Sequence, residues 1–317
     1  MEVIQCLFCG HEKLVRRYSG IYDRLHMSQA RYEIWQCCLC RSFRVHPLPS
    51  PEEIPSLYPE AYAFKKQIGH KFRQLWNNLE WQIFYSPVLG SCVKLISQET
   101  GLKKGKILDV GCGSGLRLLK FRQAGFEPEG IDFSEEDVKY VKERLGLKVR
   151  AADVEKEDLP PAEYDLIIAY WLLEHVREPE VLVRKTYAAL KPGGWVALGI
   201  PLADSLVASL FSGRWSQVKE APRHLGIPSR KGMKILLAKV GFSSISYQPV
   251  SSLELAVDIA LSLWPAGNFV LTQKKWGVLH RLFTGWLTLL SLPPIALIKT
   301  LSFPQSLTVF FGQKPHT

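Results

Sequence analysis

The feature that most constrains this chain is a glycine-rich segment, Leu108-Asp-Val-Gly-Cys-Gly-Ser-Gly115, which follows an apolar run and precedes a helical pattern. Gly111, Gly113 and Gly115 are spaced as G-x-G-x-G, which differs from the G-x-G-x-x-G of dinucleotide-binding proteins. Glycine lets the backbone turn tightly and lie close to a ligand. Asp132 follows 17 residues after Gly115, at the end of the next expected strand, where a carboxylate can accept hydrogen bonds from a ribose diol. Together these features predict a strand–loop–helix site for a ribose-containing ligand.

The middle of the chain alternates short apolar runs with helical periods. The continuous apolar runs indicate strands that are buried on both faces, as in parallel sheets. The alternation therefore predicts a doubly wound α/β sheet. We expect strands at 107–110, 129–132, 148–152, 164–169, 195–200, 242–250 and 306–312, and helices at 65–100, 116–124, 134–145, 178–190 and 229–240. The composition, with 47% hydrophobic and 22% charged residues, excludes a disordered or collagen-like chain.

Four segments of this region resemble the motifs of class I S-adenosylmethionine-dependent methyltransferases. They are Asp109-Val-Gly-Cys-Gly-Ser-Gly115, Ala152-Asp-Val-Glu155, Tyr164-Asp-Leu-Ile-Ile168 and Leu190-Lys-Pro-Gly-Gly194. The resemblance implies a Rossmann-like, seven-stranded methyltransferase sheet, with the last strand antiparallel between strands five and six. It also implies S-adenosylmethionine as the cofactor.

The same resemblance implies roles for individual residues at the cofactor. Asp109 would approach the methionine amino group, Asp132 would hold the ribose, and Asp153 would bind the adenine amino group. The full set expected at the cofactor is Asp109, Gly111, Cys112, Gly113, Gly115, Asp132, Phe133, Asp153, Val154 and Tyr170.

Two histidines are candidate bases. Glu174 and His175 resemble the Leu-Glu-His segment of ubiquinone-type O-methyltransferases, where a glutamate three residues earlier helps to hold a divalent metal; Trp171 at that position argues against a magnesium site. His175 is either catalytic or a structural residue behind the cofactor. His224 suits general-base work because a histidine titrates near neutral pH. Arg223 beside it could bind a phosphate or carboxylate; the alternative for both is a solvated loop.

The N-terminal cysteines form C-x2-C…C-x2-C through Cys6, Cys9, Cys37 and Cys40. Two such pairs can close a tetrahedral zinc site, and a site with four thiolates is structural because no position remains for substrate. Cys38 is expected to be a bystander. The alternative is a set of reduced core cysteines.

This cysteine-rich region also resembles the N-terminal zinc ribbon of a methyltransferase subgroup that acts on sugars or small metabolites. We expect a zinc ribbon at 1–50, a proline-rich linker with capping helices at 51–100 and the class I core at 101–317, with a helical insert at 251–304 and the last strand at 305–314. Tyr58, Tyr62 and Trp171 are candidate substrate contacts. The two tyrosines could equally pack against the core.

Residues 282–298 form an uncharged, apolar stretch of 17 residues. A membrane-spanning helix needs about 20 such residues, and Pro293 and Pro294 interrupt this one. Basic and tryptophan residues beside an apolar face suit a helix at a membrane surface. The segment 270–300 is therefore a candidate membrane contact, lid or dimer contact, and each option hints at an amphiphilic or lipid-linked acceptor.

The formal charge of +10 favours anionic partners, or reflects surface charge that aids solubility. The start of the sequence lacks the pattern of a signal peptide, so we expect a cytoplasmic protein with or without peripheral membrane contact. The preferred function is methyl transfer, at oxygen, to a small-molecule, sugar or lipid-linked acceptor. The alternatives are an RNA base methyltransferase, disfavoured because Asn/Asp-Pro-Pro-Tyr is absent after the fourth strand, and a non-catalytic scaffold.

Overall fold

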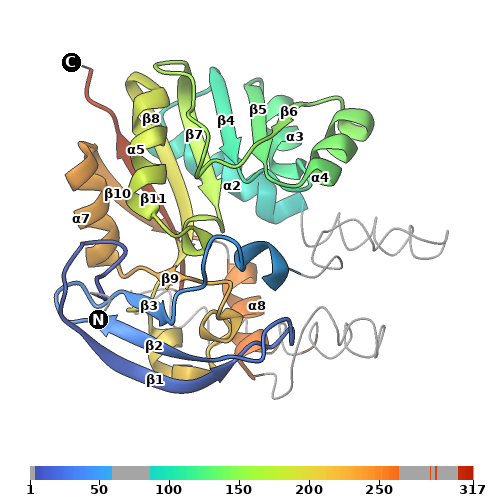
Figure 1. Ribbon diagram of the computed structural model, residues 1–317. Coiled ribbons are helices and arrows are strands. Elements are labelled where there is room, and N and C mark those ends of the chain that lie inside the picture. The colour runs from blue at the N-terminus through green and yellow to red at the C-terminus, as the bar shows by residue number, and fades with distance from the viewer. Residues whose placement is uncertain are drawn as a thin grey trace.

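The computed structural model describes residues 4–58, 86–250, 252–263, 286, 290 and 306–316. Within them lies a seven-stranded sheet with the order β10-β11-β8-β7-β4-β5-β6 (Figure 1). Its strands are β4 (Lys106–Val110), β5 (Glu127–Asp132), β6 (Lys148–Ala151), β7 (Tyr164–Tyr170), β8 (Leu190–Pro201), β10 (Ser243–Pro249) and β11 (Leu307–Gln313). β11 runs antiparallel to both β8 and β10, while β4 to β8 pair in parallel. The expected Rossmann-like methyltransferase sheet, with its reversed last strand, is confirmed.

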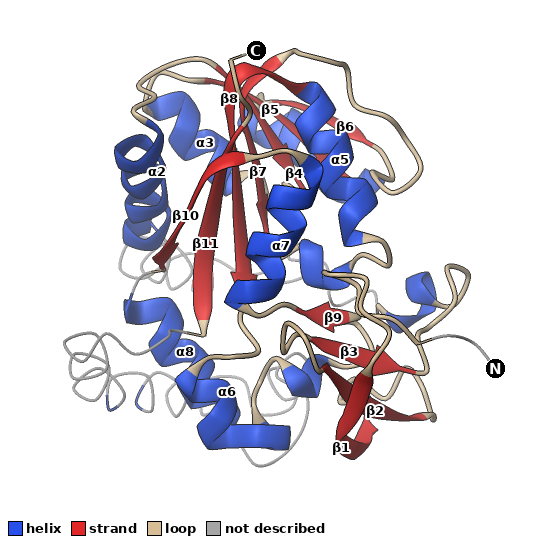
Figure 2. Cartoon of the chain, turned by 90° about the vertical axis from the view of Figure 1, so that its left-hand side faces the viewer, coloured by secondary structure: helices blue, strands red, loops and turns tan. Residues whose placement is uncertain are grey.

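Helices cover both faces of this sheet. The described helices are α2 (Ser86–Thr100), α3 (Leu116–Gln123), α4 (Glu135–Tyr140), α5 (Pro179–Ala189), α6 (Leu206–Phe211), α7 (Arg230–Val240) and α8 (Ser252–Leu263). Of these, α6 and α8 lie beyond the lower edge of the sheet in Figure 2 and do not cover its faces. α2 and α3 lie on one face and α5 and α7 on the other (Figure 2). Both faces of the parallel strands are therefore buried, as their continuous apolar runs predict.

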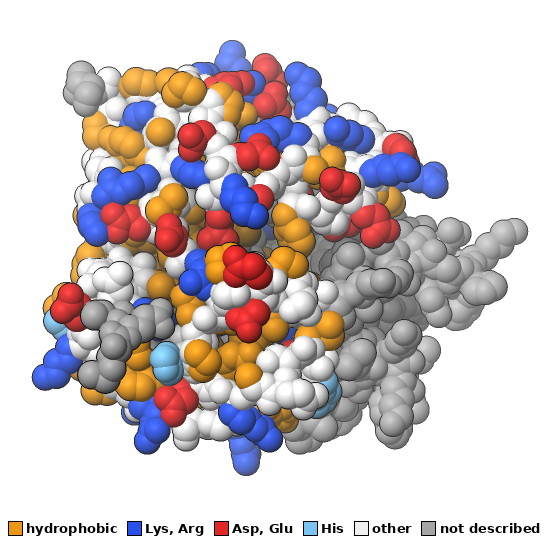
Figure 3. All heavy atoms as spheres, viewed as in Figure 1, with side chains coloured by type: hydrophobic (Ala, Val, Ile, Leu, Met, Phe, Trp, Pro, Cys, Tyr) orange, Lys and Arg blue, Asp and Glu red, His pale blue; other side chains and the backbone are white. Residues whose placement is uncertain are grey.

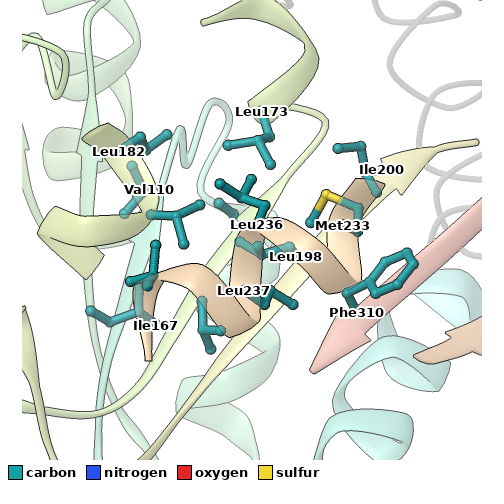
Figure 4. Packing of buried hydrophobic residues seen from close by; sticks show 14 of the residues in the cluster. Val110, Ile167, Leu173, Leu182, Leu198, Ile200, Met233, Leu236, Leu237 and Phe310 are labelled. Atoms are coloured by element: carbon teal, nitrogen blue, oxygen red, sulfur yellow. The ribbon is translucent and has the colours of Figure 1, made fainter. Parts of the chain in front are cut away.

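The packing of α7 shows how local sequence signals become core structure. The helix begins at Ser229, whose side chain accepts a hydrogen bond from the Gly232 amide, and ends at Gly241 in the left-handed conformation. Between these ends it presents Met233, Leu236 and Leu237 to the sheet (Figure 4). The helix occupies the range expected from the sequence, 229–240, apart from its capping residue Ser229.

A second, four-stranded antiparallel sheet is built mostly from the N-terminal residues. Its order is β1-β2-β3-β9, where β1 is Leu14–Tyr22, β2 is Arg31–Cys37, β3 is Phe43–His46 and β9 is Gly226–Ile227. β9 belongs to the segment that follows β8, and it pairs with β3 through Phe43–Ile227 and Arg44–Gly226. β9, from the predicted core at 101–317, is therefore the edge strand of a sheet whose other strands lie in the predicted zinc ribbon at 1–50.

The small sheet also shares its hydrophobic core with later parts of the chain. Tyr32 and Phe43 pack in one buried cluster with Trp215, Ile227 and Leu255. The indole nitrogen of Trp215 donates to Asp258 of α8 at 3.0 Å. The domain limits at 50 and 100 remain a prediction, but the N-terminal sheet is packed against later parts of the chain.

One turn signal in the sequence marks a strand irregularity. The sequence predicts a helix that ends at residue 190 and a strand that begins at residue 195, with Lys191-Pro-Gly-Gly194 between them. In the structure, β8 already begins at Leu190 and includes this segment. Leu190 pairs with Tyr164, and the register shifts before Trp195 pairs with Leu166. The left-handed Gly193 accommodates this shift inside the strand.

Parts of the expected structure lie outside the described residues. They include Tyr62, the stretch 65–85 and most of the insert 251–304, of which α8 is described. Among the described residues, no helix has both the length and the apolar character needed to cross a membrane.

We expect Leu236→Ala to lower the free energy of unfolding by about 2–5 kcal/mol, because Leu236 is fully buried and its loss leaves a cavity between α7 and the sheet. Leu210→Ala, at an exposed position of α6, should change it by less than about 0.5 kcal/mol. Urea denaturation followed by circular dichroism measures both. Equal losses in the two variants would contradict this packing.

Candidate functional site

The glycine loop joins the ends of β4 and β5. The amides of Gly111 and Cys112 both donate to the carbonyl of Ile131, at 2.8 and 3.0 Å. The amide of Gly113 donates to the Asp132 carboxylate at 2.8 Å. Gly113 has a φ of +48°, and a side chain there would meet nothing within 4 Å. The loop therefore leaves open backbone for a ligand at the carboxyl edge of the sheet.

Position 115 requires glycine for a different reason. A Cβ atom at Gly115 would lie 2.7 Å from Val141, so this residue lets α3 pack closely on the helical segment that follows α4. The residue also has a φ of +71°. Gly113 and Gly115 thus serve different ends, ligand approach and close packing.

The acid expected to hold a ribose lies at the tip of β5. Besides the Gly113 amide, Asp132 accepts a hydrogen bond from the Ser134 amide at 3.0 Å. Burial is the largest influence on this group and raises its pKa. Phe133, next in the chain, is 72% exposed. A flat apolar ring thus stands beside a buried carboxylate.

Asp153 and Val154 follow β6, the next strand outward. The Asp153 carboxylate accepts from the Glu155 amide at 3.1 Å and is about half exposed. Val154 packs partly buried against the main core. The structure therefore places the residues expected at the ribose and adenine after adjacent strands, β5 and β6.

Asp109, at the end of β4, is paired with an arginine that the sequence analysis missed. Its carboxylate is fully buried and accepts from Arg117 Nη1 at 2.9 and 3.2 Å. The guanidinium carbon lies 4.3 Å from the centre of the Tyr170 ring. Burial raises the pKa of Asp109 to about 6, against the opposing effect of Arg117. The signal available in the sequence was a basic residue in the first turn after the glycine loop.

Tyr58 connects the candidate catalytic residues to the cofactor residues. Its hydroxyl lies 3.0 Å from His175 Nδ1, and its ring centre is 6.3 Å from that of Phe133. His175 Nδ1 also lies 3.1 Å from the carbonyl oxygen of Arg223. The ring of His224 meets that of His175 edge to face, with centres 4.7 Å apart. The structure thus brings together Tyr58, His175 and His224, which the sequence gave as separate candidates for substrate contact or catalysis.

Burial dominates the protonation of this cluster. It lowers the pKa of His175 and of His224 to about 3, and raises that of Glu174 to about 8. Among the described residues, Oε2 of Glu174 has no hydrogen-bond partner. Ligand atoms of the three residues lie within 4.8 Å of one another. His175 and His224 are therefore neutral near pH 7, beside a Glu174 carboxyl group that favours its protonated form.

Arg223 lies inside the protein instead of at an open surface. Its side chain and that of Asp23 are both fully buried, and they form an ion pair at 2.7 Å. Nε of Arg223 also contacts the Glu220 carboxylate at 3.2 Å. Since Asp23 follows β1, this pair ties the N-terminal sheet to the loop that carries His224. Asp23 gave no signal in the sequence, because its partner is 200 residues away.

A cavity of about 300 Å³ lies between α2, α8 and the ends of β7 and β10. Tyr170 separates this cavity from the Asp109–Arg117 pair, and Trp171 meets Tyr170 edge to face at 6.3 Å. Its walls combine apolar and polar side chains: Ser91, Cys92, Lys94, Leu95, Gln98, Tyr170, Pro249, Val250, Glu254 and Val309. The cavity therefore lies at the carboxyl edge of the sheet and shares Tyr170 with the surroundings of Arg117.

The four N-terminal cysteines converge. Sγ of Cys6 lies 3.5 Å from that of Cys40, and Sγ of Cys9 lies 3.6 Å from that of Cys37. All four sulfur atoms fall within 4.8 Å of one another. Four thiolates at about 2.3 Å from a tetrahedral zinc ion would lie about 3.8 Å apart, so the cluster fits that ion. Cys38 is exposed and outside the cluster.

Comparison with known families identifies the class of this protein. The model of the family described as "Methyltransferase domain" matches residues 85–247, about half of the chain. The chain belongs to this methyltransferase domain family. The match covers the glycine loop, Asp132 and the His175 region, and it confirms the class I methyltransferase expected from the sequence motifs.

Curated relatives match about a third of the chain. The ubiquinone biosynthesis O-methyltransferase of Bordetella avium (strain 197N) is 38% identical over 108 residues, which are 32% of this chain and 45% of that protein. The protein of the same name from Coxiella burnetii (strain Dugway 5J108-111) is 33% identical over 107 residues, 32% of this chain and 46% of that protein. The chain thus spans about half the length of the curated relatives it matches.

Solved structures with a similar chain trace include the [4+2]-cyclase SpnF, with a TM-score of 0.49 and 19% identity over 72% of this chain and 81% of that one. A possible histamine N-methyltransferase from Thermotoga maritima has a TM-score of 0.46 and 16% identity, over 76% of this chain and 96% of that one.

The pKa of Glu174 leads to a pH prediction. The folded pKa, about 8, lies above the ordinary value of 4.5, so the folded protein binds more protons between these values and its stability falls as pH rises. Glu174→Gln is always neutral. Its free energy of unfolding should therefore rise relative to wild type by about 1.4 kcal/mol per pH unit at most across this range.

Urea denaturation at several pH values measures this difference. Glu127→Gln, at an exposed position at the start of β5, is the matched control and should follow wild type throughout. A Glu174→Gln curve parallel to wild type would show that the carboxyl group is ionised in the folded protein.

Proposed function

We propose that this protein transfers the methyl group of S-adenosylmethionine to an oxygen of a small-molecule acceptor. The observation that carries the proposal is the glycine loop of a methyltransferase-family chain, with its Gly113 amide bonded to Asp132 at 2.8 Å. The ubiquinone biosynthesis O-methyltransferases match about a third of this chain, which supports transfer to oxygen. When bound, S-adenosylmethionine supplies an electrophilic methyl group on a sulfonium.

The residues present fit this cofactor. Open backbone at Gly113 gives room for it, Asp132 offers acceptor oxygens to a ribose diol, and the exposed ring of Phe133 offers a face to adenine. Asp109 would face the methionine ammonium. Cys112, Gly111, Gly115, Val154 and Asp153 complete the proposed contacts around the loop and the end of β6.

We place the body of the acceptor in the cavity between α2 and α8. Neither His175 nor His224 lines this cavity, so the reacting oxygen would extend from it past Trp171 toward His175. Tyr170 at the end of β7 lines this cavity and packs on Arg117, which follows the glycine loop, so an acceptor there would approach the cofactor from the side of β7. The mixture of apolar and polar walls suits an amphiphilic small molecule. Exclusion of water and alignment of the acceptor oxygen are the main contributions the protein makes to such a transfer.

An acceptor hydroxyl must lose its proton as the new bond forms. We propose His175 as the base, since Tyr58 and the carbonyl of Arg223 fix its ring and Glu174 lies beside it. His224, packed against it, is the second candidate. The low pKa of both histidines in the free protein requires that the acceptor or cofactor alter this environment on binding.

The acceptor classes that we propose are a sugar, another soluble metabolite and a lipid-linked group. A lipid-linked acceptor would suit membrane contact through 270–300, which lies almost wholly outside the described residues. On the face shown in Figure 3, basic and acidic side chains are interspersed, which favours a small molecule over RNA.

Methyl-labelled S-adenosylmethionine tests these options. The purified protein is offered total RNA, extracted lipids and a soluble nucleotide-sugar pool in separate reactions. We expect label in the lipid or sugar pool, reduced at least about a hundredfold in Asp132→Ala, which loses the ribose acceptor and the bond to the Gly113 amide. Asp158→Ala, at an exposed position, is the matched control and should label normally.

The outcomes separate the functions. Label in RNA alone would establish the RNA methyltransferase in place of the small-molecule enzyme. Binding of S-adenosylhomocysteine without label in any pool would support the non-catalytic scaffold.

We also propose that Cys6, Cys9, Cys37 and Cys40 hold a structural zinc ion. The thiol of Cys6 is the main influence that lowers the pKa of Cys40 to about 5, and the thiolate is the form that binds metal. The backbone carbonyl of Cys40 accepts a hydrogen bond from Ser229 at the start of α7. Zinc would therefore stabilise both the N-terminal sheet and the helix beside it.

Elemental analysis and thermal melting test the zinc proposal. Wild type and Cys38→Ser should each contain about one zinc ion per chain. Cys37→Ser should lose the ion and melt several degrees lower, because its tetrahedral site is broken. A Cys37→Ser protein with unchanged metal content would rule the cluster out as the zinc site.

A further inference from the structure

Arg117 stands where the buried end of β4 meets the cofactor loop. It belongs to the first turn of α3, directly after the glycine loop, and its side chain is 14% exposed. One of its nitrogens, Nη1, contacts both oxygens of Asp109. Arg117 is therefore a buried cation held beside the carboxylate that is expected to face the methionine ammonium.

The contacts of Arg117 leave part of its donor capacity unused. A guanidinium carries five N–H donors in one plane. Its plane lies near Tyr170, with 4.3 Å between the guanidinium carbon and the ring centre, and Nε is buried without a hydrogen-bond partner among the described residues. A buried donor without a partner costs free energy unless a ligand supplies an acceptor.

The amino-acid end of S-adenosylmethionine would supply that acceptor. It is a zwitterion, with an ammonium and a carboxylate on one carbon atom. Asp109 and Arg117 present the opposite charges side by side, and Arg suits planar recognition of a carboxylate. Binding would leave no net charge unpaired in the buried site.

We infer that Arg117 binds the carboxylate of the methionine moiety while Asp109 binds its ammonium, so that the pair selects a cofactor with an intact amino-acid end. This inference rests on the proposed function. A simpler arrangement, in which the pair only ties α3 to β4, predicts no dependence on the ligand carboxylate.

Isothermal titration with two ligands tests the inference. The first ligand is S-adenosylhomocysteine; the second is its decarboxylated form, which keeps the ammonium and lacks the carboxylate. Wild type should bind the second about tenfold to a hundredfold more weakly, as expected for a lost charged hydrogen bond. Arg117→Gln should bind both ligands with affinities within about twofold of each other.

The controls separate ligand contact from folding. Arg122→Gln, an exposed arginine on the same helix, should discriminate between the ligands as wild type does. Arg117→Lys keeps the charge without the planar fork, so it should fold and discriminate less than wild type, and it decides the question if Arg117→Gln does not fold.

Two results would overturn the assignment to Arg117 while leaving the proposed function intact. One is wild-type protein that binds both ligands equally; the other is Arg117→Gln that weakens both ligands but retains the wild-type ratio. Wild-type protein that binds neither ligand would contradict the proposed function itself, and the inference with it.

Discussion

The hydrogen bond from the Gly113 amide to the Asp132 carboxylate joins the ends of two parallel strands into one site. It requires the left-handed backbone of the loop, which glycine adopts without strain, and a carboxylate at the tip of β5. Because the parallel strands all end at this edge, the loops after β6 and β7 are brought to the same place. The remaining candidate residues are arranged around this contact.

Buried charge is the second constraint on the site. Asp109 and Arg117 form one buried pair, and Asp23 and Arg223 form another. Removing either partner of such a pair leaves an uncompensated buried charge, which lowers the free energy of unfolding by about 3–5 kcal/mol. The first pair lies beside the proposed cofactor site, and the second fixes the N-terminal sheet to the loop of His224.

Much of the fold was predictable because its signals are local. Ser229 and Gly241 mark the ends of α7 through capping and left-handed backbone, and the buried strands appear as continuous apolar runs. The start of β8 was predicted wrongly because proline and glycine occur both in turns and in strand bulges, so the Pro-Gly-Gly segment does not distinguish the two. Similarly, the cysteine spacing predicted the cluster, whereas nothing in the spacing showed that β9 pairs with β3.

The sequence alone determined the class I methyltransferase sheet, the glycine loop with Asp132 and the four cysteines that converge, because each depends on neighbours in the chain or on fixed spacing. Only the tertiary structure decided which polar groups become buried together. It placed Arg117 on Asp109, Arg223 on Asp23, and Tyr58 between Phe133 and His175. These contacts depend on packing between distant segments, and burial then shifts the pKa values of Glu174, His175 and His224, so their chemistry has no signature in local sequence.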